Sequence, residues 1–250
     1  MKVVIPVKRT PDPYGKIRLT SDGRVDDSDI KWVVNPFDEI AIEEAVRLRE
    51  NGLDIEIITV SVGTSHVVEQ LRVSLAMGAD RSVHVEYEGD IDPGIVSFFL
   101  SKVIEQESAD LVLMGKQAID GDYGQVGGRL AGLLNWPQAT FASNISIDES
   151  NRVVEVAREI DSGQETIRLK LSAVVTVDLR LNEPRYVALP AIIKARSKPI
   201  DTISASELGT PPDLQISIVK LEEPPARKAG RKVGSVGELI SVLKNEAKVV

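Results

Sequence analysis

The middle of the chain reads Leu111-Val112-Leu113-Met114-Gly115-Lys116-Gln117-Ala118-Ile119-Asp120-Gly121-Asp122-Tyr123-Gly124-Gln125-Val126-Gly127-Gly128. Leu111 to Met114 is an apolar run of strand length, Gly115 to Asp122 predicts a loop, and Tyr123 to Leu134 predicts a helix. A strand that leads through a loop into a helix is the repeating unit of α/β proteins. In these proteins ligands bind outside the carboxyl ends of parallel strands, so this loop is a candidate site.

Strands and helices alternate in the same way on the N-terminal side. We predict strands at Val3 to Val7, Ile55 to Ser61 and Ser82 to Val85, and helices from Asn35 to Asn51, Ser65 to Met77 and Pro93 to Glu107. The first helix has the clearest beginning, because Asn35 suits the cap, Pro36 the first turn and Asp38 the positive end of the dipole. The alternation predicts an α/β fold with a doubly wound, mostly parallel sheet.

The second half departs from this alternation. Residues 145–177 are strand-like with polar turns, which predicts an appended antiparallel hairpin and a final strand at Ala173 to Val177. Residues 200–250 are poor in apolar side chains, with one short helix predicted between Val236 and Lys244. We therefore divide the chain into an α/β domain at 1–199 and an extended C-terminal arm at 200–250, which we expect to pack on another chain.

The composition excludes several classes of protein. The formal net charge of −8 and the pI near 5.0 argue against a general nucleic-acid binder, which needs a basic surface. The absence of cysteine rules out disulfides, thiolate metal sites and cysteine-ligated clusters. No apolar run approaches the roughly 20 residues of a membrane span, and no separate targeting segment precedes the first strand. We expect a soluble protein of the bacterial cytoplasm or, in a eukaryote, of the mitochondrial matrix.

The sequence offers little catalytic equipment. The two histidines, His66 and His84, lack a metal-ligand or triad setting, and we expect ordinary hydrogen-bonded or exposed side chains. No pair of carboxylates is marked by sequence as general acid and base. We therefore expect a chain without catalytic residues or a metal site of its own.

The loop from Gly115 to Val126 has features of a phosphate site. Unpaired backbone N–H groups at the start of the following helix attract anions. Gly121 and Gly124 would let a ligand approach the backbone, whereas Gly127 and Gly128 would let the helix lie close to the sheet.

Other features of this loop leave its role open. Its spacing matches neither a Walker loop nor a dinucleotide fingerprint. Asp120 and Asp122 would repel a phosphate unless they cap the helix or bind ribose hydroxyls. Residues 35–38 would serve the same ligand, or they form only an ordinary capped helix. On the residues alone, nucleotide binding and simple close packing are both open.

Residues 179–199 form a locally basic segment in an acidic chain. Its charged residues are one acid and five cations, Glu183, Arg180, Arg185, Lys194, Arg196 and Lys198. Its apolar residues lie between prolines, in a run too short for a core helix: Leu189, Ala191, Ile192 and Ile193. An exposed apolar tip among cations would dock an acidic partner, and a loop packed on its own domain is the alternative.

Five segments together resemble the β subunits of electron-transfer flavoproteins. They are Val7-Lys8-Arg9, Asn35-Pro36-Phe37, Ala76-Met77-Gly78-Ala79-Asp80-Arg81, Gly115-Lys116-Gln117-Ala118-Ile119-Asp120 and Asp178-Leu179-Arg180-Leu181-Asn182-Glu183-Pro184-Arg185-Tyr186. The likeness runs from the first strand to about Pro199 and more faintly through the arm. The last of the five segments is the most specific.

This resemblance implies a fold related to adenine-nucleotide-binding domains and a heterodimer whose α subunit holds the redox-active FAD. The arm at 200–250 would wrap that α subunit. The resemblance also implies that the chain binds AMP, without a redox role, at Pro6, Asn35, Pro36, Phe37, Asp38, Val62, Gly115, Lys116, Gln117, Ala118, Ile119, Asp120, Gly121, Asp122, Tyr123, Gly124, Gln125 and Val126.

The resemblance further implies a route for electrons. They would pass from acyl-CoA dehydrogenases of fatty acid oxidation to the FAD, and then to a membrane electron-transfer flavoprotein:quinone oxidoreductase. Residues 179–199 would be the recognition loop that docks the dehydrogenase, through Tyr186, Leu189, Pro190, Ile192, Ile193, Lys194 and Arg196. Leu189 would be its apolar anchor.

Two other functions stay open. Asp120-Gly121-Asp122 and Gln125-Val126-Gly127 also resemble the electron-bifurcating branch, whose β subunit binds a second FAD in place of AMP. Against this, Leu181-Asn182-Glu183-Pro184-Arg185-Tyr186 resembles the dehydrogenase-serving branch. A free-standing ATP-binding stress-type protein of the same fold would need no flavin partner, and the long arm argues against it.

Overall fold

The computed structural model describes residues 1–226 and 229–250, which divide into two compact units. The first unit contains Met1–Ile17 and Asp27–Val219. The second contains Arg18–Asp26 and the described residues of Lys220–Val250. None of the described helices is both long and apolar enough to cross a membrane.

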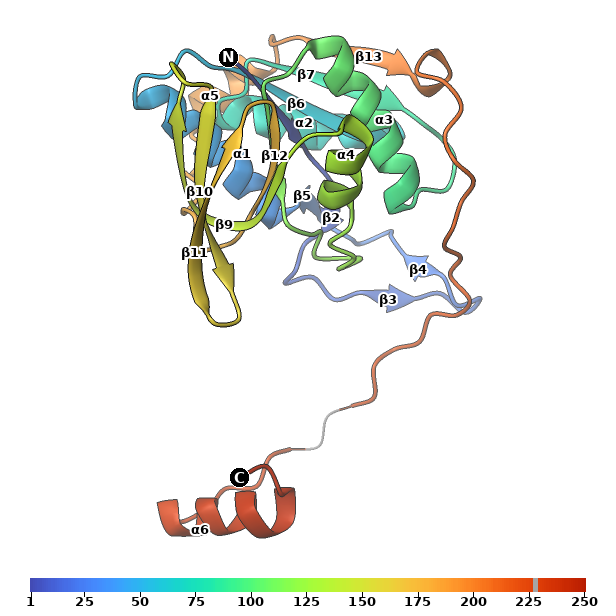
Figure 1. Cartoon of the computed structure of the whole chain (residues 1–250). Coiled ribbons are helices and arrows are strands. Elements are labelled where there is room, and N and C mark those ends of the chain that lie inside the picture. Colours follow the sequence, from blue (N-terminus) through green and yellow to red (C-terminus); the bar gives the residue numbers. More distant parts are fainter. Residues whose placement is uncertain (227–228) are drawn as a thin grey trace. The chain divides into compact units, whose positions relative to one another are not determined.

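The first unit is built on a sheet whose nine strands, as described, follow the order β11-β10-β9-β12-β8-β1-β6-β7-β13 (Figure 1). The strands are β1 (Lys2–Pro6), β6 (Glu56–Gly63), β7 (Arg81–Glu86), β8 (Leu111–Gly115), β9 (Gln138–Asp148), β10 (Val153–Ile160), β11 (Gly163–Lys170), β12 (Ala173–Val177) and β13 (Ile200–Ser204). In this spatial order, the seven strands from β9 across to β13 are parallel to their neighbours. At the other side of β9, β10 and β11 add an antiparallel hairpin. The predicted mostly parallel sheet with an appended hairpin is therefore confirmed.

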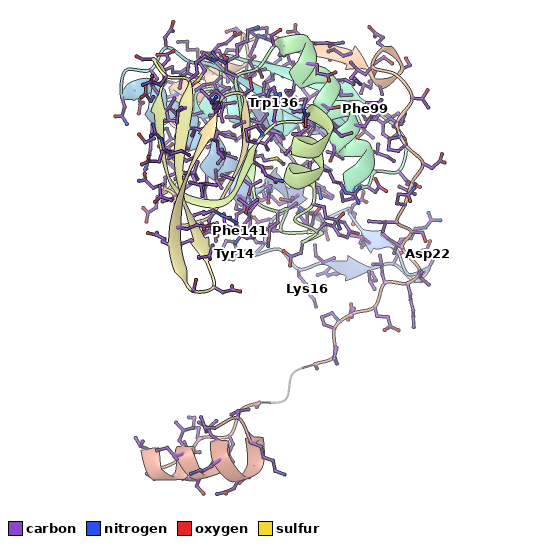
Figure 2. All side chains as sticks on the ribbon, viewed as in Figure 1. Tyr14, Lys16, Asp22, Phe99, Trp136 and Phe141 are labelled. Carbon is purple, nitrogen blue, oxygen red and sulfur yellow. The ribbon has the colours of Figure 1, made fainter. Side chains whose placement is uncertain are left out.

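Helices cover both faces of this sheet. They are α1 (Pro36–Glu50), α2 (Val68–Met77), α3 (Pro93–Glu107) and α4 (Val126–Leu134), with single 3-10 turns at Ser65–Val67 and Ala205–Glu207. The short helix α5 (Leu189–Ala195) packs on α2. Because side chains alternate along a strand, Val3 and Ile5 join the core under α1 and α2, whereas Val4 joins the core under α3 and α4. Phe99 of α3, labelled in Figure 2, is fully buried in the second of these cores.

Two strands differ from the sequence-based expectation. The prediction that Ala173–Val177 is the last strand was wrong, because β13 pairs with β7 at the edge of the sheet. The first strand of the hairpin region begins at Gln138, directly after Trp136-Pro137, rather than near Ile145. Both strands contain polar side chains, because β13 lies at an edge of the sheet and one face of β9 is exposed. Neither strand therefore has the continuous apolar run from which the other parallel strands were predicted.

A small two-stranded sheet connects β1 to α1. It consists of β2 (Arg9–Pro11) and β5 (Trp32–Val34), which run antiparallel with Arg9 opposite Val34. These strands were not predicted, because each contains only three residues. They hold the chain close to the carboxyl end of β1.

The second unit contains one short hairpin and one short helix. The hairpin pairs β3 (Arg18–Leu19) with β4 (Val25–Asp26). Helix α6 (Val236–Val242) begins at Ser235, whose hydroxyl accepts from the Glu238 N–H at 3.1 Å, and it continues as a π-helical turn at Leu243–Ala247. The predicted helix between Val236 and Lys244 is confirmed, and its apolar side chains Val236, Leu239 and Ile240 are exposed.

Candidate nucleotide cleft and docking segment

A cleft of about 400 Å³ opens at the carboxyl ends of the central strands. Pro6 at the end of β1, Gly63 at the end of β6 and Gly115 at the end of β8 all line it. β1 lies between β6 and β8, so the chain leaves β1 toward one side and later returns on the other. Such a reversal of strand order is where open α/β sheets bind ligands.

Asn35 ties the start of α1 to the loop that follows β8. Its side-chain N–H donates to the Gln117 carbonyl at 2.9 Å, and its Oδ1 accepts from the Ile119 N–H at 3.2 Å. The predicted side-chain cap is therefore absent from α1. Only the Asn35 carbonyl serves the helix, where it accepts from the Asp38 N–H at 2.8 Å. The side chain instead fixes one wall of the cleft.

Asp38 ties the ends of two strands together. Its buried carboxylate accepts from the Lys8 N–H at 2.8 Å and from the Gly115 N–H at 3.1 Å. Burial raises the pKa of Asp38 to about 7, although both hydrogen bonds act in the opposite direction. A Cβ atom at Gly115 would lie 2.5 Å from Asp38 Oδ1, so this close approach requires glycine.

Two lysines of the cleft wall are held by carboxylates. Lys8 Nζ lies 2.7 Å from Asp120 Oδ1. Lys116 Nζ lies 2.7 Å from Asp178 Oδ2 and also faces the Phe141 ring at 5.0 Å. The loop between β8 and α4 is thus pinned at both sides by ion pairs.

Helix α4 begins at Val126, so the predicted start at Tyr123 was wrong. The loop instead continues through Gly124, whose φ of 59° is the left-handed conformation that glycine adopts most easily. A Cβ atom at Gly127 would lie 2.5 Å from Thr176 Cγ2, which agrees with the predicted close approach of this helix to the sheet. Gly128 has no such role, because its nearest neighbour would be Gln138 Oε1 at an ordinary 3.6 Å.

The segment at 179–199, which we call the docking segment, presents apolar side chains to the surface. The exposed fraction is 96% for Tyr186, 67% for Leu189, 60% for Ile193 and 42% for Ile192. Pro190 lies in the first turn of α5, a helix of only seven residues. The segment thus packs on its own domain without burying these apolar side chains.

Polar contacts fix the docking segment at both of its ends. At one end, Arg185 lies 2.7 Å from Glu43 Oε2 and 2.7 Å from Glu50 Oε1, both on α1. At the other end, Arg72 of α2 donates to the carbonyls of Ala195 and Lys198 at 2.9 and 2.6 Å. The apolar tip is therefore held as an arch between two anchored ends.

Few of the predicted cations remain free on this arch. Arg185 pairs with α1, Arg180 pairs with Glu159, and the Lys198 ammonium donates to the Leu75 carbonyl at 3.1 Å. Lys194 and Arg196 have no carboxylate partner among the residues that the structure describes. Fewer positive charges are thus available to a partner than the five cations of the sequence suggest.

Comparison with known proteins places the chain in a family. The family model described as "Electron transfer flavoprotein domain" matches residues 22–208. The chain belongs to the electron transfer flavoprotein family. It is 48% identical over its full length to the protein named electron transfer flavoprotein subunit beta from Bradyrhizobium diazoefficiens, and all of that relative is covered. It is also 47% identical to the mitochondrial subunit beta of Arabidopsis thaliana and 48% identical to subunit beta of Homo sapiens, with 100% of this chain and 100% and 99% of those relatives covered.

These comparisons confirm the predicted resemblance to electron-transfer flavoprotein β subunits. The relatives are similar from end to end, so the likeness is not confined to the five segments that suggested it. An electron-transport role follows for the chain as a member of this flavoprotein family.

The structure brings most of the predicted nucleotide residues to one cleft. The residues that line it are Pro6, Asn35, Asp38, Val62, Gly115, Lys116, Gln117, Ala118, Gly121, Asp122, Tyr123, Gly124, Gln125 and Val126. Pro36, Phe37, Ile119 and Asp120 do not line it. The binding of AMP by these residues stays a prediction.

Several residues of the cleft wall were not predicted. Lys8 and Arg9 follow β1, and Thr64 and His66 follow β6. Their position after parallel strands is the signal that could have identified them. His84, in contrast, is buried in β7, where its Nε2 lies 2.9 Å from the Gly63 carbonyl oxygen. In the described part of the chain, no group of His, Cys, Asp and Glu residues is arranged to hold a metal ion.

Proposed function

We propose that this chain is the β subunit of a heterodimeric electron-transfer flavoprotein of the dehydrogenase-serving branch. Its larger α subunit would hold the redox-active FAD, which accepts electrons from acyl-CoA dehydrogenases and passes them to a membrane quinone oxidoreductase. The chain itself would bind AMP and dock the dehydrogenase, without catalytic residues of its own. The setting would be a bacterial cytoplasm or a mitochondrial matrix.

The cleft at the carboxyl ends of β1, β6 and β8 is the observation that supports nucleotide binding. Its wall has an apolar part that includes Pro6, Val62 and Met114, which suits an adenine ring. Its other part is the loop that ends at α4, whose first backbone N–H groups suit a phosphate. The hydrogen bonds from Asn35 and Asp38 hold these two parts of the wall together.

The nucleotide proposal is tested by identifying what the purified complex contains. The chain is co-expressed with its α subunit, the yellow heterodimer is precipitated with acid, and released nucleotides are measured by mass spectrometry. We expect one FAD and one AMP per heterodimer. Two FAD molecules would indicate the electron-bifurcating branch instead. A colourless, stably folded monomer would favour the free-standing ATP-binding alternative.

The exposed arch of the docking segment supports the dehydrogenase contact. Leu189 has the largest exposed fraction among the leucine, isoleucine and valine side chains of the segment, and a few residues of an interface often carry most of its binding energy. Leu189→Ala should slow electron transfer from an acyl-CoA dehydrogenase while the flavin spectrum stays unchanged. Leu133→Ala on α4 is the matched control, since Leu133 is 53% exposed but lies outside the segment. Equal transfer rates in both variants would remove Leu189 from this role.

The exposed apolar side chains of α6 support the proposal that the arm packs on the α subunit. Val236, Leu239 and Ile240 have helical spacing, and a solvated helix gains nothing from them. Leu239→Glu together with Ile240→Glu should weaken the heterodimer, which analytical ultracentrifugation measures. Lys244→Glu, a charge change in the same region, is the control. Retained association in the double variant would assign the helix another role.

A further inference from the structure

Three long basic side chains lie on the wall of the cleft, and they differ in their partners. Lys8 and Lys116 each lie 2.7 Å from a carboxylate oxygen, of Asp120 and Asp178 respectively. Arg9 has neither an ion pair nor a side-chain hydrogen bond with any residue in the described part of the chain. Of these three cations, Arg9 is the one whose charge is left for a ligand.

Trp32 holds Arg9 in place. The guanidinium carbon lies 3.8 Å from the centroid of the Trp32 ring, a short cation–π contact. Arg9 and Trp32 belong to β2 and β5, which pair as a small antiparallel sheet beside the end of β1. The contact orients the plane of the guanidinium group, but it satisfies none of the five N–H donors.

The position of Arg9 is unfavourable without an anion nearby. Its Nε atom is buried and has no hydrogen-bond partner among the described residues. Burial lowers the pKa of Arg9, and Glu69 and Asp27 only partly offset this by attraction from beyond ion-pair distance. A buried donor without a partner costs free energy that an anionic oxygen in the cleft would recover.

The three carboxylates that line the cleft already have other hydrogen-bond donors. Asp38 accepts from the backbone of Lys8 and Gly115, and Asp92 accepts from the N–H groups of Ile95 and Gln215 at 2.9 and 2.7 Å. Asp122 accepts from the side-chain amide of Gln117. None of the three pairs with Arg9 in the described part of the chain.

We propose that Arg9 is an anion-binding residue of the cleft and donates hydrogen bonds to a phosphate of the bound nucleotide. A guanidinium group presents parallel donors that match two oxygens of one phosphate. This inference rests on the nucleotide binding proposed above, and it adds a residue that the family resemblance did not assign to the site.

The test combines removal of the guanidinium with removal of the phosphate. The heterodimer is stripped of endogenous nucleotide by dialysis against mild denaturant, and the affinities for AMP and adenosine are measured by isothermal titration calorimetry. The variants are Arg9→Gln, Arg9→Lys and the control Arg168→Gln, an exposed arginine of β11 outside the cleft. The quantity compared is the ratio of the AMP affinity to the adenosine affinity.

We expect this ratio to fall at least about tenfold in Arg9→Gln, which corresponds to about 1.4 kcal/mol. The ratio should fall less in Arg9→Lys, which keeps the positive charge but loses the parallel N–H donors of the guanidinium group. It should not change in Arg168→Gln. An unchanged ratio in Arg9→Gln would overturn the inference, as would an equal loss of affinity for both ligands. If the glutamine variant does not assemble, an unchanged ratio in Arg9→Lys overturns it. Failure of the wild-type protein to bind either ligand would instead refute the proposed nucleotide site.

Discussion

Replacing Gly127 by alanine isolates the contact that brings helix α4 against the sheet. Alanine is the better helix former, so the substitution in an unobstructed helix gains about 1 kcal/mol. At Gly127 the added Cβ would lie 2.5 Å from Thr176 Cγ2, whereas favourable carbon contacts lie at about 3.5–4.0 Å. The helix or strand β12 must therefore move by about 1 Å, and overpacking of this kind costs about 1–3 kcal/mol. We expect a net loss of up to about 2 kcal/mol in the free energy of unfolding.

The same helix supplies matched controls. Gly132→Ala meets nothing within 4 Å, and Gly128→Ala meets only the flexible end of Gln138 at 3.6 Å, so both should be neutral or stabilising. Thr176→Ser removes the obstructing methyl group while keeping Oγ1, which accepts from the Phe141 N–H at 3.3 Å. The double variant should therefore recover part of the loss.

Urea unfolding followed by circular dichroism measures these differences, and the double-mutant cycle gives the coupling between the two sites. We expect Gly127→Ala and Thr176→Ser to couple favourably by about 1 kcal/mol or more. If Gly127→Ala is as stable as Gly132→Ala, or if the two changes are additive, the contact with Thr176 does not restrict the helix.

Two further predictions concern side chains that hold the cleft and the docking segment. Because burial raises the folded-state pKa of Asp38 to about 7, its contribution to stability is complete below its unfolded pKa of about 4 and is lost as the pH rises toward 7. Titration of Asp38 should therefore lower the unfolding free energy of the wild-type protein by on the order of 2 kcal/mol between pH 5 and pH 7.5. Asp38→Asn cannot titrate, so this part of the pH dependence should be absent from the variant when urea unfolding is measured at both pH values. Identical pH profiles would contradict this assignment. Arg185→Met leaves the buried Glu43 with Arg47 as its remaining arginine partner and should lower the free energy of unfolding by about 1–3 kcal/mol. Because one end of the arch is then released, trypsin should cleave more rapidly after Lys194. An unchanged cleavage rate would show that other contacts fix the arch.

The sequence predicts those elements whose ends carry local signals. Helix α1 begins at Pro36 and α3 at Pro93, as expected from proline in the first turn. Helix α4 has no such signal, and contacts from elsewhere in the chain pin the preceding loop, so its start could not be located from the residues around Tyr123. Strand β13 escapes prediction for a related reason, because its pairing with β7 joins segments that are far apart in the sequence.

The candidate site shows the same division between local and distant information. The loop after β8 was identifiable from its glycines and its place after an apolar strand, and its members largely line the cleft. The role of Asn35 was misjudged, because a local cap was expected and its side chain instead bonds to Gln117 across the fold. The pairing of Lys8 with Asp120 and of Lys116 with Asp178, which distinguishes these lysines from Arg9, joins residues that are far apart in the sequence.

The outer strand of the hairpin has a consequence for the tendency of the chain to aggregate. β11 ends the sheet, and an edge strand is a template on which other chains can add strands and aggregate. Along this edge Glu165 and Lys170 are exposed, and Arg168 extends toward Glu155 on the neighbouring strand. Charged side chains of both signs discourage such addition. These charges therefore disfavour strand addition at the open edge that β11 leaves on the sheet.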